Sequence, residues 1–327
     1  MQFVGEYMNN VFLISVNSVL IIFTIIIVGY ILEKSKIFNS RFSQDISNLV
    51  VDIALPFSIF LSTQKYITKT NFLLLLKGTI LIMIAILLCF VISISISKIF
   101  HLKKSIRSLF INGFVNSNTL FVGLPLNLAL FGSSSLPYFL CYFVANTIAT
   151  WGIGIKLINY DNPEKIVSTN NSWKKLINIF TPPMWGFIIG LIMFFGDFQI
   201  TGFLKTAFSY LANLVTPLSL IFLGLQLGQT KLSALKISGL DLFTQIGKFV
   251  ISPLVMYIII VIAQRLQLVT LQPIFIKTLV VQSATPMLTL LPVMASQSQL
   301  DVGFATRILT ESLLIFPLAV IVIMLIL

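Results

Sequence analysis

Residues 112–127 read NGFVNSNTLFVGLPLN, which interrupts a long apolar segment with amides, glycines and a proline. Residues 282–292 read QSATPMLTLLP and interrupt another apolar segment in the same way. Proline removes a backbone donor and clashes with the preceding helical turn, and in lipid every freed N–H or C=O group needs another partner. We therefore expect two broken membrane helices whose freed backbone groups face a cavity and bind a ligand.

The composition around these two stretches is that of a membrane protein. Of 327 residues, 57% are hydrophobic and only 9% are charged, too few charges to cover the surface of a soluble domain of this length. The first apolar run, residues 11–32, is too long for the core of a signal peptide, so we expect it to be a retained helix. We read the net charge of +11 as loop charges beside anionic lipid rather than as a nucleic-acid surface.

Ten segments are long and apolar enough to span a hydrocarbon core of about 30 Å, which takes about 20 residues. They lie near residues 11–32, 46–63, 71–97, 108–131, 136–158, 181–197, 207–228, 239–263, 273–296 and 303–327. The longest connection falls between the fifth and sixth segments. We therefore expect a first five-helix repeat, a cytoplasmic linker and a second five-helix repeat, at residues 1–158, 159–180 and 181–327.

The two halves align with each other. Pro56 of the second segment aligns with Pro217 of the seventh. In the same way, Pro125 of the fourth segment aligns with Pro292 of the ninth. Because five spans is an odd number, the second half must enter the membrane in the opposite sense, as in many secondary transporters. Chance similarity between apolar helices is the alternative, and two proline pairs in the correct order favour the repeat. The expected fold is all-α and polytopic, with ten transmembrane helices in a 5+5 inverted repeat.

Lysine and arginine placement predicts the orientation, because loops on the cytoplasmic side are enriched in both. With the N-terminus outside, the outer loops carry four basic residues, Lys65, Lys69, Lys205 and Arg265. The inner loops carry thirteen: Lys34, Lys36, Arg41, Lys98, Lys103, Lys104, Arg107, Lys156, Lys165, Lys174, Lys175, Lys231 and Lys236. We expect a multi-pass protein of the plasma membrane with both termini outside.

The two interrupted segments supply most of the candidate substrate-binding residues. N-termini of half-helices offer partial positive charge and free N–H donors, which suit an anion such as a carboxylate. Asn118 is the strongest candidate, and the repeat places it opposite Thr285. The full set is Asn112, Asn116, Asn118, Thr119, Gly123, Pro125, Gln282, Ser283, Thr285, Pro286 and Thr289, with Asn146 and Lys248 from the fifth and eighth segments. The alternative is that the proline kinks serve helix packing alone.

Ionisable residues inside spans are costly and are functional candidates by default. Lys248 is the best candidate for balancing an anion, and Asp52 and Glu311 are the best candidates for carrying a proton. Arg307 and Glu311 lie four residues apart on one helix face, so we expect them to pair, either as structural support or as part of the mechanism. Asn146 aligns with Glu311 in the repeat. A uniporter driven by membrane potential would need no proton carrier.

The sequence offers no recognisable chemistry for an enzyme. Its one histidine, His101, lies in a basic stretch, and Cys89 and Cys141 lie inside apolar runs. These residues cannot form a histidine-based triad, a zinc site or a disulfide framework, and no pair of aspartates stands in a membrane motif. We therefore expect no catalytic residue, no metal and no cofactor.

Several motifs together resemble the auxin efflux carrier family. Residues 118–125, NTLFVGLP, resemble the Asn-x-x-Phe-x-Gly-x-Pro signature of its fourth helix, which is fairly specific. Three supporting stretches resemble its ninth, seventh and second helices, namely residues 284–286 (ATP), 216–224 (TPLSLIFLG) and 54–56 (ALP). The likeness covers nearly the whole chain in order.

The resemblance implies a scaffold of helices 1, 2, 6 and 7 and a mobile transport domain of helices 3–5 and 8–10, with helices 4 and 9 crossed. It implies organic anion substrates, auxin in plant members and malate or similar acids in bacterial ones, and a homodimer through the scaffold. The long loop of many plant members is missing, which favours a bacterial-type carrier of malate or another carboxylate. The alternatives are a sodium-coupled symporter of the bile-acid type and a sensor derived from a transporter.

Overall fold

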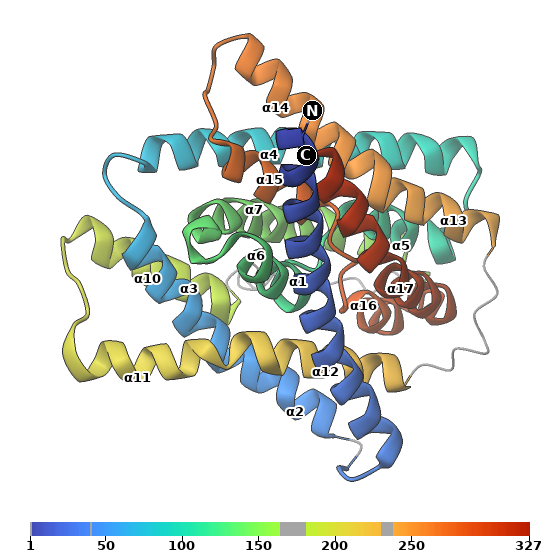
Figure 1. Ribbon diagram of the computed structural model, residues 1–327. Coiled ribbons are helices and arrows are strands. Elements are labelled where there is room, and N and C mark those ends of the chain that lie inside the picture. The colour runs from blue at the N-terminus through green and yellow to red at the C-terminus, as the bar shows by residue number, and fades with distance from the viewer. Residues whose placement is uncertain (1, 40, 164–180, 230–237) are drawn as a thin grey trace. The chain divides into compact units, whose positions relative to one another are not determined.

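The computed structural model describes residues 2–39, 41–163, 181–229 and 238–327 (Figure 1). In this part of the chain all named elements are helices, and the single β-bridge joins Ser117 to Met287. The chain divides into two compact units. Unit 1 comprises Met1–Leu75, Leu120–Leu140 and Phe180–Lys231, and unit 2 comprises Leu76–Thr119, Cys141–Ile179 and Leu232–Leu327.

Helices overlap each of the ten segments expected from the sequence. Within the described residues, six have the length and hydropathy of membrane spans: Phe42–Tyr66, Phe72–Ile99, Ser133–Asp161, Gly202–Gln229, Gly239–Arg265 and Val302–Ile326. Shorter apolar helices lie at Thr119–Phe131, Pro182–Phe195 and Pro273–Ser283. A count of ten spans remains a prediction. Most of the expected linker, residues 164–180, and both Lys231 and Lys236 lie outside the described residues.

Unit 1 is built from two pairs of packed helices. In the first pair α1 crosses α12, and in the second α3 lies against α10 (Figure 1). The α11 helix continues into α12 after a turn. The elements of unit 1 are α1 (Gln2–Ser35), α2 (Phe42–Asn48), η1 (Leu49–Ala54), α3 (Leu55–Tyr66), α6 (Leu124–Phe131), η3 (Ser133–Ser135), α10 (Pro182–Phe195), α11 (Gly202–Asn213) and α12 (Val215–Gln229).

Glycines allow both pairs to approach closely. A Cβ on Gly224 of α12 would collide with the backbone of α1, including the Cα of Gly29. A Cβ on Gly186 of α10 would collide with the backbone of Pro56 in α3, and one on Gly190 would meet the Thr63 side chain. Lipid tails are as apolar as leucine, so membrane helices gain stability chiefly from such close van der Waals contact.

Unit 2 is built around α5, the first part of the first interrupted helix, which ends at Val115. Its elements are α4 (Phe72–Ile99), α5 (Lys104–Val115), most of α7 (Leu136–Ala149), η4 (Thr150–Gly154), α8 (Ile155–Asp161), α13 (Gly239–Ile246), η6 (Gly247–Ile251), α14 (Ser252–Arg265), α15 (Pro273–Ser283), α16 (Leu291–Gln297) and α17 (Val302–Ile326). The α5 helix packs against α8, α13, α16 and α17. The interrupted segments are therefore enclosed by helices rather than left at an edge.

Prolines explain three of the π-helical turns. The turns η1, η2 (Thr119–Gly123) and η6 each end two residues before a proline, at Pro56, Pro125 and Pro253. A proline has no N–H for the carbonyl four residues earlier. A π-turn accommodates the missing hydrogen bond, because its N–H groups donate to the carbonyl oxygen five residues earlier. In η1, the Leu55 N–H accordingly donates to the Val50 carbonyl oxygen.

Candidate functional site

The two interrupted helices of unit 2 meet through their backbones. The α5 helix ends at Val115, and Asn116 is extended, with φ −78° and ψ 131°. The α15 helix ends at Ser283, and α16 begins only at Leu291. Ser117 and Met287 form an antiparallel bridge, and the Asn118 N–H donates to the Pro286 carbonyl oxygen at 2.8 Å. We expected the freed groups to face a cavity, but in the structure several of them bond to one another.

Ser117 is the best-connected residue of this bridge. The Asn146 side chain accepts from the Ser117 N–H at 3.1 Å and donates to its carbonyl oxygen at 3.0 Å. Ser117 Oγ lies 2.6 Å from Lys248 Nζ and 3.1 Å from the Tyr142 hydroxyl. Asn146 and Lys248, which the sequence suggested, therefore both reach the first broken helix.

Lys248 is fully buried, with 0% of its surface exposed. It lies in the π-turn η6, and its ammonium also donates to the Val115 carbonyl oxygen at 3.2 Å. Gly247 holds this turn against α5, because a Cβ there would collide with the Phe114 ring. Three ion pairs form among the described residues, and none includes Lys248. Its charge is therefore met by neutral oxygens alone.

The second broken helix is held from α17. Ser312 Oγ accepts from the Met287 N–H at 3.3 Å. The hydroxyls of Thr285, just after α15, and of Ser283, its last residue, donate to carbonyl oxygens of α15, those of Gln282 (2.9 Å) and Val280 (2.7 Å). The other expected residues here, Gln282, Pro286 and Thr289, belong to the same segment of unit 2, and Gln282 and Thr289 are buried.

Two asparagines extend the polar region along α5. Asn116 Nδ2 donates to Asn112 Oδ1 at 2.7 Å, and Asn112 Nδ2 donates to the carbonyl oxygens of Ser108 (2.7 Å) and Gly154 (3.2 Å). Asn116 Oδ1 is buried, and no described residue donates a hydrogen bond to it. A Cβ on Gly154 would collide with both amide groups, so this glycine makes room for the pair.

The expected pairing of Arg307 with Glu311 is wrong. Arg307 donates to both carboxylate oxygens of Asp241 on α13, at 2.7 and 3.2 Å. Glu311 Oε2 instead accepts from Gln245 Nε2 at 3.3 Å. Helical spacing places Arg307 and Glu311 on one face, but Asp241 offers the guanidinium a second hydrogen bond, and two parallel bonds favour that partner.

Three other candidates belong to the other compact unit. Gly123 and Pro125 belong to unit 1, at the end of η2 and the start of α6, whereas Thr119 closes the unit 2 segment. Asp52 is exposed on η1, also in unit 1. The sequence reasoning missed Ser117, Tyr142, Gln245 and Ser312. Their signal was weak: Ser117 stands between two asparagines, and Gln245 lies one turn before Lys248.

A small cavity lies beside the bridge. It has a volume of about 10 Å³ and is lined by Cys89, Val115, Tyr142, Ser252 and Ser283, among others. A volume of this size holds about one water molecule. A ligand as large as a dicarboxylate would therefore require the surrounding helices of unit 2 to move.

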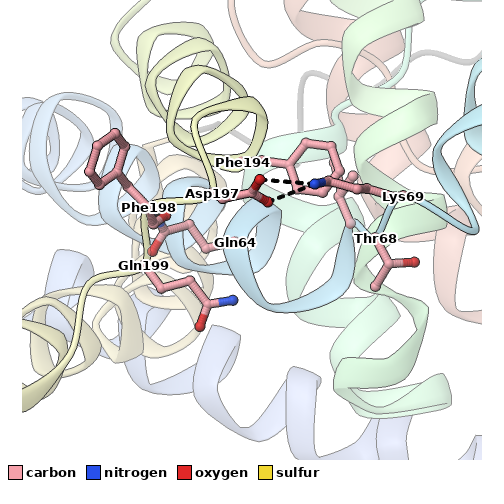
Figure 2. Close-up of a pocket in the computed structure, with 8 residues that line it drawn as sticks. Gln64, Thr68, Lys69, Phe194, Asp197, Phe198 and Gln199 are labelled. Atoms are coloured by element: carbon pink, nitrogen blue, oxygen red, sulfur yellow. Dashed lines mark hydrogen bonds and ion pairs between the residues drawn. The ribbon is translucent and has the colours of Figure 1, made fainter.

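A larger cavity of about 290 Å³ lies in unit 1 (Figure 2). Lys69 and Asp197 form a 2.9 Å ion pair there, with 71% and 72% of their side chains exposed. Gln64 donates to the Phe198 carbonyl oxygen at 3.2 Å and accepts from the Ile200 N–H at 3.3 Å. The Gln64 amide thus holds the loop that follows α10. The Lys69–Asp197 ion pair is so exposed that it contributes little to stability. We read this cavity as a loop junction.

In the described part of the chain, six helices are long and apolar enough to cross a membrane, which indicates a multi-pass membrane protein. The model of the membrane transport protein family matches residues 14–324. The chain therefore belongs to this family, the auxin efflux carrier family that its fourth-helix motif resembles.

Two curated archaeal proteins are similar to the chain. One is described as an uncharacterized transporter of Methanocaldococcus jannaschii. It is 25% identical over 294 residues, which cover 89% of this chain and 91% of that protein. The other, from Methanothermobacter thermautotrophicus, carries the same description. It is 24% identical over 221 residues, or 66% of this chain and 69% of that protein.

Proposed function

We propose that the protein is a secondary transporter of a small organic anion, malate or another small carboxylate, that works by alternating access. Family membership makes it a membrane transport protein. The observation that carries the choice of an anion is Lys248, a fully buried ammonium that contacts the backbone bridge through Ser117. A charge kept inside a membrane protein without a counter-charge needs a role.

The chemistry around Lys248 suits a carboxylate. A buried ion without its partner costs several kcal/mol, and a bound anion would offset that cost. The ammonium has three N–H donors, and Ser117 and Tyr142 supply hydroxyl groups next to it. Asn118 adds an amide at the same break, and we keep it as the residue that contacts the substrate.

Transport would open and re-form this region on alternate sides of the membrane. The small cavity beside the bridge has no room for a dicarboxylate, so binding would separate the helices that enclose it. We include in the proposal a scaffold of helices 1, 2, 6 and 7 and a transport domain of helices 3–5 and 8–10 with helices 4 and 9 crossed. The two compact units divide the chain in a similar way, except that Leu120–Leu140 falls in unit 1.

Two pairs of related contacts support an inverted repeat of ten spans. The first segment packs on the seventh as α1 on α12, and the sixth packs on the second as α10 on α3. Exchanging the two halves turns one pair into the other. Likewise Asn146 in the fifth segment binds Ser117 of the fourth, and Ser312 in the tenth binds Met287 of the ninth.

We place the protein in the plasma membrane, with both termini outside and the linker inside, as a homodimer. Single cysteines at Ser134 and Ser168, in a background without Cys89 and Cys141, should label from opposite sides of intact cells. Labelling of Ser168 from the outside would reverse the orientation.

The decisive experiment combines binding and flux. Thermal-shift screening of the purified protein against organic acids, with and without sodium, should show stabilisation by a small carboxylate. Uptake of labelled L-malate into proteoliposomes should follow, and Lys248→Met should reduce it about tenfold or more at malate concentrations below saturation. Strict sodium dependence would favour the bile-acid-type alternative. Stabilisation without flux of any acid would indicate a sensor.

A further inference from the structure

Glu311 and Gln245 form a second polar pair inside unit 2. Both are buried, each with only 4% of its surface exposed. Gln245 Nε2 donates to the Ile308 carbonyl oxygen at 2.9 Å and to Glu311 Oε2 at 3.3 Å. The remaining oxygen of each side chain, Glu311 Oε1 and Gln245 Oε1, is buried and has no hydrogen-bond partner among the described residues.

Among the described residues, no basic side chain forms an ion pair with Glu311. Arg307, one turn earlier on α17, is committed to both oxygens of Asp241. Asp241 faces Glu311 from α13 with the same sign of charge, and Asp301 caps the start of α17. Three other elements pack against α17. The first turn of α5 carries Lys104 and Arg107, and Arg107 pairs with Asp161. The α15 helix carries Lys277, and the sequence of α16 has no charged residue.

A proton satisfies this pair better than a metal ion does. An ionised carboxylate only accepts hydrogen bonds, whereas a protonated one also donates through its O–H. Hard cations take six or more oxygen ligands, and this pair offers two oxygens without partners. A proton requires only one oxygen. It would pass from hydronium to Glu311 Oε1, leaving water, and would return to water on the other side of the membrane.

The pair is linked to both sides of the bridge. Ser312, the next residue after Glu311, holds the Met287 N–H. Lys248, three residues after Gln245, holds Ser117 and the Val115 carbonyl oxygen. A change of charge on Glu311 therefore acts on two elements that each contact one broken helix.

We propose that Glu311 carries the proton that couples substrate movement to a pH gradient, with Gln245 as its positioning residue. This inference rests on the proposed anion transport. The same geometry assigns no comparable role to Asp52, which is exposed in unit 1.

The test measures labelled L-malate uptake and proton movement together, in lightly buffered proteoliposomes that contain a pH-sensitive dye. We expect wild-type protein to move protons with malate. Glu311→Gln, which imitates the neutral acid, should carry malate without protons, and its uptake should no longer change with outside pH. Asp45→Asn removes an exposed carboxylate from α2 and should retain proton movement. Glu311→Asp keeps a titrating group and should retain it as well.

Each result decides between distinct statements. Malate flux without protons in the wild type overturns the coupling and leaves the transport function intact. Proton movement that survives in Glu311→Gln, or that is lost in Asp52→Asn instead, also overturns it. If the wild type carries neither malate nor any other acid of the panel, the proposed function itself fails. Should Glu311→Gln not fold, as judged by its unliganded melting temperature, Glu311→Asp decides: a shifted pH dependence of malate uptake supports Glu311 as the carrier, and an unchanged one overturns the assignment.

Discussion

Two lysines in this molecule occupy opposite environments. Lys69 in unit 1 lines the cavity of about 290 Å³, is mostly exposed and pairs with Asp197 (Figure 2). Lys248 in unit 2 lies beside a much smaller cavity, is fully buried and bonds to neutral oxygens. Water and a carboxylate satisfy the first charge, whereas the second keeps an unmet demand for a negative partner. We therefore base the proposed anion site on the uncompensated charge of Lys248 and not on the size of a cavity.

Lys248→Met breaks this comparison with the largest expected effect. Loss of a charge-assisted hydrogen bond should weaken malate binding by roughly 1.5–3 kcal/mol, about tenfold or more. Unliganded stability should hold or rise, because an uncompensated buried charge is replaced by an apolar chain of similar length. Thermal shift with and without malate measures both. Lys69→Met is the matched control, and an equal loss of affinity in both variants would refute the distinction.

Gly247→Ala tests whether the position of the π-turn matters. The new methyl group would collide with the Phe114 ring, and overpacking of this kind costs about 1–3 kcal/mol. We expect a lower melting temperature and weaker malate binding, because the turn that carries Lys248 is displaced. Gly152→Ala places its methyl in open space and serves as the control. Equal stability of the two variants would show that the contact with Phe114 is easily relaxed.

Asn118→Ala separates the side chain from the backbone at the bridge. The bond from its N–H to the Pro286 carbonyl oxygen survives the substitution. A side chain that contacts the ligand should cost roughly 1–3 kcal/mol of binding with little change in apo stability. Thr285→Val should cost less binding, because that hydroxyl is already bonded to the Gln282 carbonyl oxygen at the end of α15. If Asn118→Ala keeps both affinity and transport rate, the substrate binds elsewhere.

Lys69→Ala, which removes the exposed lysine of the two, should have the smallest effect on stability. Exposed ion pairs contribute less than about 1 kcal/mol and are screened by salt. Chemical denaturation of Lys69→Ala, Asp197→Ala and the double variant would measure the coupling between the two side chains. Coupling well above this range would show that the cavity in unit 1 is more than a loop junction.

The sequence predicted where the helices lie and are interrupted better than it predicted which side chains pair between them. Proline and amides mark both interruptions because each removes or competes for backbone hydrogen bonds, a local effect that a single chain reveals. The partner of Arg307 could not be predicted in this way. Helical spacing identifies neighbours on one helix, such as Glu311, whereas Asp241 lies 66 residues away.

The candidate site shows the same division. Lys248 and Asn146 were visible as polar residues in apolar segments, and both contact the first broken helix. Ser117 and Ser312 were not visible, because serines bind backbone groups inside many membrane helices without further meaning. Only their contacts across the fold distinguish them. Asn118 was chosen for its side chain, whereas the bond that ties it to the second broken helix comes from its backbone.

The π-turn η6 also changes the direction in which successive side chains point around the helix axis. An α-helix advances about 100° per residue, so side chains four apart drift by about 40° around its axis. Thr244, Lys248 and Ser252 are spaced by four, and all three contact α5 or the residues just after it. The wider turn between them cancels part of the drift and keeps them on one face. Removal of a single residue from η6 would therefore rotate one end of this helix against the other and turn either Lys248 or Ser252 away from α5.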